Sequence, residues 1–369
     1  RAARGSGVAR AAAAWGGEYV EEAAEAANAV QRAMQLCQGL ACDMQKSDTT
    51  SVGKEMDACD VTAGVSVLKA GDSTPVTAAD FAIQGMVAAH LKKHFPEDRF
   101  MGEEDADSLR EDEDLCALSM SLAAKYGGPG STVGNHRDDF LAAVDSGMEA
   151  DRGKGERVWV LDPIDGTKGF MTGQGYIIGL ALLVDGEPVV GLMGNPNKED
   201  GPPIMVAVKG QGLRWWPAEG EGPLKYEAPE PAWAKETYSP PKGGKAGADY
   251  PPWLLSPQTA REKCQPFGSE APASDVCCGA MIKYFAVAEG THSGFIQFEE
   301  KLKTWDHACG VICVAEAGGK AACTDAAGQQ VRFPDRLFNV KGGVVCSSRW
   351  TSPEAREYLM AAAKKNAKE

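Results

Sequence analysis

Apolar residues follow two different periods along the chain, and each period predicts a different kind of element. Residues 18–40 are rich in alanine and place apolar side chains at helical spacing, which predicts an amphipathic helix. A short extended segment is expected at 65–68. A second helix is expected over 78–94, because Thr77 is a good N-cap and Pro96 follows the end of the helix.

Short, dense apolar runs in the middle of the chain predict buried strands. These runs lie at 158–161, 177–184, 188–193, 204–208 and 213–216. Asp185-Gly186-Glu187 separates two of them with the residues of a tight hairpin turn. The acidic stretch 105–155 that precedes them is weakly patterned, so helical pieces and loops are expected there.

The pattern stops at 217–255, a stretch dense in Pro, Gly, Glu and Lys, which is the best candidate for a connector. Beyond it, helices are expected over 276–288, 306–317 and 353–363, and strands over 294–298, 321–324 and 343–346. Helices and strands mix in both halves, which indicates layered α and β structure in two packed domains. We therefore place an N-terminal α+β domain at 18–216 and a C-terminal α/β domain at 256–369.

Charge and hydropathy narrow the classes of partner. The net charge of -14 argues against a nucleic acid polymer, because binding its phosphates requires a basic face. An acidic protein can still bind a small phosphate if metal ions supply the positive charge. No apolar run reaches the ~18 residues of a membrane-spanning helix, so no membrane partner is expected. The sequence does not indicate an oligomeric state.

The N-terminal residues 1–17 contain Arg and Ala but no acidic residue. They resemble the end of an organellar transit peptide, with an unstructured extension as the equal alternative. The absence of an initial Met favours processing or trimming. An organelle is therefore expected, the chloroplast ahead of the mitochondrion, with the cytoplasm as the other location.

The cysteines and histidines give no metal signature. The 11 cysteines are odd in number and form no C-x-x-C pair, so neither a zinc motif nor a compact disulfide framework is predicted. A reducing compartment is expected, with Cys309 and Cys313 as buried thiols. Redox control through the adjacent Cys277 and Cys278 is a hypothesis. His90 and His94 lie four apart on one expected helix, and with no third ligand evident they are expected on its surface.

The strongest chemical signal is the segment 159–170, W-V-L-D-P-I-D-G-T-K-G-F. An apolar strand delivers Asp162 and Asp165 to a turn in which Gly166 allows the chain to bend closely. Paired carboxylates suit a hard cation, because Mg²⁺ takes oxygen ligands. Amides at Gly166 and Thr167 would hold a phosphate if a helix begins there. The alternative is a simple turn capped by Thr167.

Three further segments contain acids, and each has a simpler explanation by itself. The run G-E-E-D at 102–105 fits a solvated charged face. A capping box explains T-A-A-D at 77–80. In W-D-H-A at 305–308, the helix dipole alone would stabilise Asp306.

Together, P-V-T-x-x-D, G-E-E, D-P-I-D-G-T and W-D-x-A-x-G with E-A-G-G resemble the inositol monophosphatase-like phosphatases over residues 73–348. The forms D-P-I-D-G-T-K-G-F and W-D-H-A are similar to the 3′(2′),5′-bisphosphate nucleotidase branch, and the C-terminal stretch is most similar to its plant and algal organellar members. The resemblance implies a layered αβαβα sandwich of the inositol monophosphatase and fructose-1,6-bisphosphatase type.

The resemblance also implies a site for two to three Mg²⁺ ions. Its expected ligands are Glu103, Asp162, the carbonyl of Ile164 and Asp165 for one ion, Asp162, Asp165 and Asp306 for the second, and Glu103 with Asp80 for the third. Asp80 and Thr167 would align and deprotonate the attacking water, with Glu104 in support. The amides of Gly166 and Thr167 would hold the phosphate, and Lys168, Lys283 and His307 are the other expected substrate contacts.

The activity implied is hydrolysis of the 3′-phosphate of 3′-phosphoadenosine 5′-phosphate (PAP) to AMP, a step of sulfur metabolism, with inhibition by Li⁺. The corresponding 5′-phosphosulfate (PAPS) is a further candidate substrate. Ala280 and Gln297 depart from the nucleotidase pattern, which has Ser and Arg there. They leave open a phosphatase of inositol or sugar phosphates on the same metal site. A catalytically weak regulatory or redox-responsive homologue is the third alternative.

Overall fold

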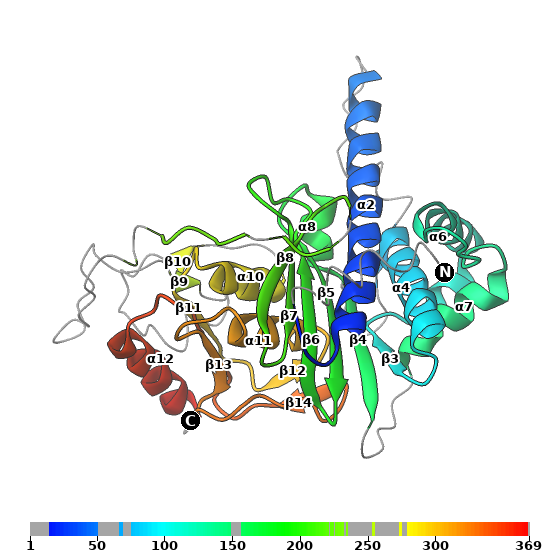
Figure 1. Cartoon of the computed structure of the whole chain (residues 1–369). Coiled ribbons are helices and arrows are strands. Elements are labelled where there is room, and N and C mark those ends of the chain that lie inside the picture. The colour runs from blue at the N-terminus through cyan, green and yellow to red at the C-terminus, as the bar shows by residue number, and fades with distance from the viewer. Residues whose placement is uncertain are drawn as a thin grey trace.

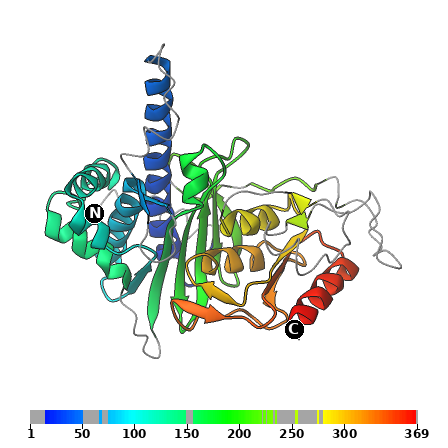
Figure 2. The same ribbon diagram turned by 180° about the vertical axis from the view of Figure 1, so that it is seen from behind.

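The computed structural model describes residues 15–50, 66–68, 75–148, 156–220, 222–224, 226–231, 234, 253–254, 273–274 and 279–367. Its helices are α2 (Val20–Thr50), α4 (Ala78–His94), α5 (Asp107–Glu111), α6 (Glu113–Tyr126), α7 (Arg137–Asp145), the 3₁₀ helix η1 (Ser146–Met148), α8 (Thr167–Met171), α10 (Met281–Glu289), α11 (Ala308–Ala315) and α12 (Pro353–Asn366). Figure 1 shows their arrangement, and Figure 2 shows the opposite side.

A six-stranded sheet forms the centre of the molecule. Its strands, in spatial order, are β3 (Arg99–Gly102), β4 (Arg157–Asp165), β5 (Ile177–Val184), β6 (Glu187–Gly194), β7 (Ile204–Val208) and β8 (Gly212–Trp216). β3 pairs with β4 in parallel, and the remaining neighbours are antiparallel. The hairpin between β5 and β6 turns at Asp185 and Gly186, both with positive φ, as a type I′ turn requires.

A five-stranded sheet lies in the C-terminal half. Its order is β10 (Ala273–Ser274), β9 (Trp253–Leu254), β11 (Gly294–Gln297), β15 (Val344–Ser347) and β13 (Ala322–Asp325). Two smaller pairs complete the strands, β1 (Ser66–Leu68) with β2 (Pro75–Thr77), and β12 (Lys301–Lys303) with β14 (Leu337–Asn339).

Helices and sheets alternate in five layers. α2 and α4 cover one face of the six-stranded sheet, and α10 and α11 lie between its other face and the five-stranded sheet. α12 covers the outer face of that second sheet. The αβαβα sandwich expected from the sequence is therefore confirmed.

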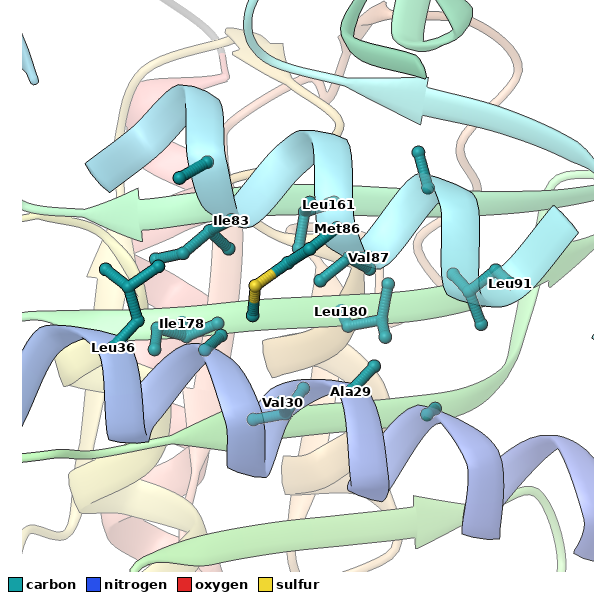
Figure 3. Packing of buried hydrophobic residues seen from close by; sticks show 14 of the residues in the cluster. Ala29, Val30, Leu36, Ile83, Met86, Val87, Leu91, Leu161, Ile178 and Leu180 are labelled. Carbon is teal, nitrogen blue, oxygen red and sulfur yellow. The ribbon is translucent and has the colours of Figure 1, made fainter. Parts of the chain in front are cut away.

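Alternation along the central strands explains these layers. Leu161, Ile178 and Leu180 point to α2 and α4, where they meet Val30 and Val87 (Figure 3). Their sequence neighbours on the same strands, including Val160 and Ala181, join the apolar cluster formed with α10 and α11. Each fully buried aliphatic side chain contributes about 1.5–3 kcal/mol by leaving water. Both faces are buried, so the strands have continuous apolar runs.

Most elements form where the hydrophobic pattern predicts them, and the differences lie at the ends of elements and in some short strands. α2 continues ten residues beyond the predicted 40, to Thr50. α11 begins at Ala308, so Asp306 precedes the helix rather than opening it. β4 extends to Asp165, so both aspartates lie within the strand. The strands β3, β12 and β14 were not predicted, since each is too short to show a period.

The cysteines differ in part from the expectation. Cys309 and Cys313 are buried thiols, as predicted. Cys323 and Cys346 face each other on β13 and β15 and form a disulfide, which the spacing of cysteines did not indicate because the pairing depends on strand register. Cys277 and Cys278 lie outside the described residues, as does most of the predicted connector.

Candidate active site

The site lies where β4 leaves the six-stranded sheet. Asp162 still pairs with Gly179 of β5, and the pairing is irregular between Asp162 and Asp165. The backbone then turns at Gly166, whose φ of 97° is costly for residues with a side chain, and α8 begins at Thr167. The D-P-I-D-G-T segment therefore places two buried carboxylates directly before a helix start, where the sequence had left a simple turn as the alternative.

Asp165 connects the two halves of the molecule. Its carboxylate accepts hydrogen bonds from the backbone amides of Ala280 and Met281 at the start of α10. Gly279 makes this approach possible, because a Cβ there would lie 2.6 Å from Oδ2 of Asp165. Burial raises the pKa of Asp165 to about 6, although the two amides and Lys283 lower it. Sequence analysis did not identify Gly279 as a partner of Asp165, since the two residues are far apart in the chain.

Thr167 and Asp80 meet across two elements. Oδ2 of Asp80 accepts from the amide of Thr77 at 2.8 Å and from its hydroxyl at 2.7 Å, so the predicted capping box is present. The other oxygen, Oδ1, lies 3.5 Å from the hydroxyl of Thr167, which also donates to the carbonyl of Ile164 at 3.1 Å. The capping box therefore aims one oxygen of Asp80 at Thr167.

Glu103 and Glu104 follow the end of β3, beside η1. Gln84 of α4 holds this turn, because its side-chain amide donates to the carbonyl of Glu104 at 2.6 Å and accepts from the amide of Glu104 at 3.0 Å. Glu104 is buried, and Glu103 is partly exposed with Oε1 3.6 Å from Nζ of Lys303. The run G-E-E is therefore a fixed turn rather than a solvated charged face.

Asp306 lies between β12 and α11 in the C-terminal half, and like Asp165 it is close enough to Lys283 to oppose the lowering of that amine's pKa by burial. The preceding Trp305 packs under the guanidinium of Arg336 at 4.6 Å. Arg336 also donates to the carbonyls of Gly102 at 2.9 Å and of Gly147. It thus joins the segment before Glu103 to the segment that carries Asp306, and sequence analysis did not identify it.

Two of the predicted substrate contacts are deeply buried. Nζ of Lys283 donates to Oε1 of Gln297 at 2.7 Å, and burial lowers the pKa of this amine despite the nearby Asp165 and Asp306. His307 has its Nδ1 2.8 Å from the hydroxyl of Tyr284, and burial together with Lys283 lowers its pKa to about 3. His307 is therefore a neutral packing residue here, whereas Lys168 is exposed on α8.

The acidic side chains around β4 fit a hard cation. Asp80, Asp162 and Asp165 are almost completely buried, and Glu104 is also buried. Carboxylates packed in this way destabilise one another and lose hydration unless positive charge balances them. The basic side chains that interact with Glu103 or Asp165 include Lys303, Arg336 and Lys283. An all-oxygen donor set of this kind suits Mg²⁺.

The predicted ligands do not form a tight trio in this structure. Within the described residues, one group of three acidic, His or Cys side chains has ligand atoms all within 4.8 Å of one another, and it is Glu25, His90 and His94. These residues are partly or fully buried between α2 and α4, so the expectation of surface histidines without a third ligand is wrong. The third side chain of this group, Glu25, comes from another helix, which sequence spacing does not reveal.

Comparison with known proteins places the chain in a family. The model of the inositol monophosphatase family matches residues 19–368. A protein of Arabidopsis thaliana, provisionally named a mitochondrial 3′(2′),5′-bisphosphate nucleotidase, is 31% identical over 359 residues, which cover 90% of this chain and 84% of the relative. A 3′(2′),5′-bisphosphate nucleotidase of Oryza sativa is 29% identical over 92% of this chain and 93% of its own length.

Solved structures agree on the fold. The extragenic suppressor protein suhB of Bartonella henselae has a TM-score of 0.53 and 19% identity, covering 91% of this chain and 96% of that protein. The chain belongs to the inositol monophosphatase family. The names of its relatives further class it as a phosphoric monoester hydrolase. Among the described residues, no helix is long and apolar enough to cross a membrane.

Proposed function

We propose that the chain is a Mg²⁺-dependent phosphatase that removes the 3′-phosphate of PAP and releases AMP. Relatives over most of its length are named 3′(2′),5′-bisphosphate nucleotidases, which supports this substrate. The observation that carries the proposal is the position of the Thr167 hydroxyl. It lies between the carbonyl of Ile164 and the carboxylate of Asp80, at the C-terminal end of β4. PAPS is a second candidate substrate of the same site.

Thr167 and Asp80 are suited to move a proton. Oδ2 of Asp80 accepts from Thr77, and Oδ1 faces the hydroxyl of Thr167. In the proposed reaction, the water oxygen bonds to phosphorus as the bond to the ribose 3′-oxygen breaks. One proton of the water passes through the Thr167 hydroxyl to Asp80, and the ribose oxygen takes a proton from solvent. Glu104, fixed by Gln84, supports this arrangement.

Phosphoryl transfer requires the charge on the phosphate oxygens to be neutralised. Bound Mg²⁺ would supply that charge and lower the pKa of the attacking water. The residues proposed to hold two to three ions are Asp80, Glu103, Asp162, Asp165, Asp306 and the carbonyl of Ile164. The amides of Gly166 and Thr167 would hold the phosphate, and the exposed Lys168 would attract the substrate from solvent.

A second candidate function is hydrolysis of inositol or sugar phosphates. Ala280 has no hydroxyl to offer a nucleotide, and its amide is already bonded to Asp165. Lys283 is buried and donates one of its three N–H groups to Gln297, so a second phosphate would reach this ammonium only if the side chains covering it moved. Both observations favour a substrate with fewer contacts on the C-terminal side of the site.

A substrate panel separates the two candidates. Phosphate release would be measured from PAP, PAPS, inositol 1-phosphate and fructose 1,6-bisphosphate, with and without Mg²⁺ and Li⁺. The proposal expects kcat/KM to be highest for PAP, to require Mg²⁺ and to fall with Li⁺. Higher kcat/KM for inositol or sugar phosphates would leave the hydrolytic site in place and reject the nucleotide. Absence of hydrolysis with Mg²⁺ bound would support a regulatory homologue.

We also propose an organellar location. The provisional name of the Arabidopsis thaliana relative includes the mitochondrion, which favours that organelle over the chloroplast expected from the sequence. A C-terminal fluorescent fusion of the full-length protein, imaged with mitochondrial and plastid markers, tests this location.

A further inference from the structure

Glu25, His90 and His94 form a polar cluster between α2 and α4. Nε2 of His90 lies 3.1 Å from Oε2 of Glu25, and Nδ1 of His94 lies 3.5 Å from Oε1 of the same carboxylate. The three side chains are 9%, 14% and 10% exposed for His90, His94 and Glu25. The cluster is therefore held inside the helix pair, although none of its members takes part in the proposed phosphatase reaction.

The geometry of the cluster is close to that of a tetrahedral metal site. Zinc bonds to nitrogen and oxygen at about 2.0–2.1 Å, so two ligand atoms of a tetrahedron are ~3.3 Å apart. The two histidines contact different oxygens of Glu25, at separations of 3.1 Å and 3.5 Å that are close to this value. One ligand atom from each residue lies within 4.8 Å of the other two, so binding an ion requires these separations to shorten by up to ~1.5 Å. Two imidazoles and one carboxylate are a ligand set that suits zinc and not Mg²⁺.

A cavity gives the cluster access to solvent. It has a volume of about 370 Å³ and is lined by both histidines, Arg32, Lys93 and the loop 127–133. An ion could enter through this cavity, and a water molecule from it could complete the coordination. The cavity satisfies the need for both an entry path and a fourth ligand.

We propose that Glu25, His90 and His94 bind Zn²⁺ and thereby fasten α2 to α4. The site is distinct from the acidic centre, which is the proposed Mg²⁺ site of Asp80, Glu103, Asp162, Asp165 and Asp306. Asp80 and His90 are ten residues apart on α4, which corresponds to ~15 Å along a helix. The ion would fix the C-terminal turns of α4, the helix whose N-terminal turn presents Asp80.

Arg32 contacts His90 and provides a second test of the zinc site. Its Nη1 lies 3.2 Å from Nδ1 of His90, and because arginine only donates, Nδ1 is the acceptor and Nε2 carries the proton toward Glu25. Binding of zinc at Nε2 would require the ring proton to move from Nε2 to Nδ1, where it would face the guanidinium. Arg32 therefore competes with zinc, and Arg32→Gln should relieve the competition, since an amide oxygen can accept from Nδ1.

The test is zinc binding by the whole protein, stripped with a chelator and then titrated with Zn²⁺ while saturating Mg²⁺ occupies the acidic centre. Calorimetry gives stoichiometry and affinity, and Co²⁺ in place of Zn²⁺ gives a visible spectrum that distinguishes a tetrahedral site with imidazole ligands from an all-oxygen site. One ion for each chain is expected. His90→Ala or His94→Ala should lower its affinity by more than the roughly 10- to 100-fold that loss of an outer partner costs.

Matched variants distinguish zinc binding at this site from zinc binding elsewhere and from the effects of misfolding. His136→Ala removes an exposed histidine at the start of α7 and should leave zinc binding unchanged. Asp162→Asn alters the acidic centre and should also leave zinc binding unchanged. Arg32→Gln should tighten binding, a gain that an unfolded variant cannot produce. Equal zinc affinity in wild type and His94→Ala, or weaker binding in Arg32→Gln, would overturn the proposal.

Discussion

Arg336 donates from Nη2 to the carbonyl of Gly102 over 2.9 Å, and Gly102 is the residue directly before Glu103. The same guanidinium donates to Gly147 and stacks on Trp305, the residue directly before Asp306. Two proposed metal ligands from opposite halves of the molecule are thus positioned by one side chain. Removing it should loosen the site without touching a ligand.

Arg336→Met should lower kcat/KM and raise the Mg²⁺ concentration required for half-maximal rate, each by roughly 10- to 100-fold, the usual cost of losing a group that orients a ligand. Initial rates measured across a Mg²⁺ series check this. Arg332→Met is the matched control, because Arg332 is 58% exposed and pairs only at the surface with Glu187. Equal Mg²⁺ requirements in the two variants would contradict the positioning role.

Asp165→Asn should abolish measurable turnover, because it removes a charge from the proposed metal site. It should also reduce the free energy of unfolding by about 1–3 kcal/mol, since one of the two amides that Asp165 binds would lose its acceptor. Steady-state assays and urea unfolding measure the two effects. Asp98→Asn provides the comparison: Asp98 is another buried aspartate, bonded to Arg157 and Trp159, so only stability should fall.

Thr167→Val preserves the shape of the side chain and deletes its hydroxyl. Loss of the proposed proton path should lower kcat by about 10²- to 10⁴-fold, with KM little changed. Thr167→Ser keeps the hydroxyl and should retain most of the rate, which makes it the control. A Val variant with the kcat of wild type would remove Thr167 from the mechanism.

Mg²⁺ should stabilise the fold, because it binds the native acidic centre and relieves the repulsion among buried carboxylates. At a free concentration 100 times its Kd, the gain in free energy of unfolding is about 2.7 kcal/mol. Thermal melts with MgCl₂ and with NaCl at equal ionic strength measure the gain. The increase should shrink in Asp306→Asn, whereas an unfolding temperature indifferent to Mg²⁺ in wild type would count against the metal site.

The sequence predicted those parts of the site that depend on neighbours in the chain. The capping box of Thr77 and Asp80 and the turn after Asp165 are local patterns, and the structure confirms both. Arg336 and Gly279 were missed, since their contacts with Gly102 and Asp165 join residues more than one hundred positions apart. His90 and His94 were wrongly predicted to lie on the surface for the same reason, because their partner Glu25 lies on α2, far away in the chain.

Asp165 accepts its hydrogen bonds from the first residues of α10, far later in the chain, and Asp306 comes later still. During synthesis, the six-stranded sheet can therefore be complete while the ribosome has yet to add these partners. A nascent or truncated chain that ends before residue 280 lacks the helices that cover one face of that sheet. Its apolar surface would be exposed to chaperones. Phosphatase activity would begin only after the C-terminal helices have packed against the sheet.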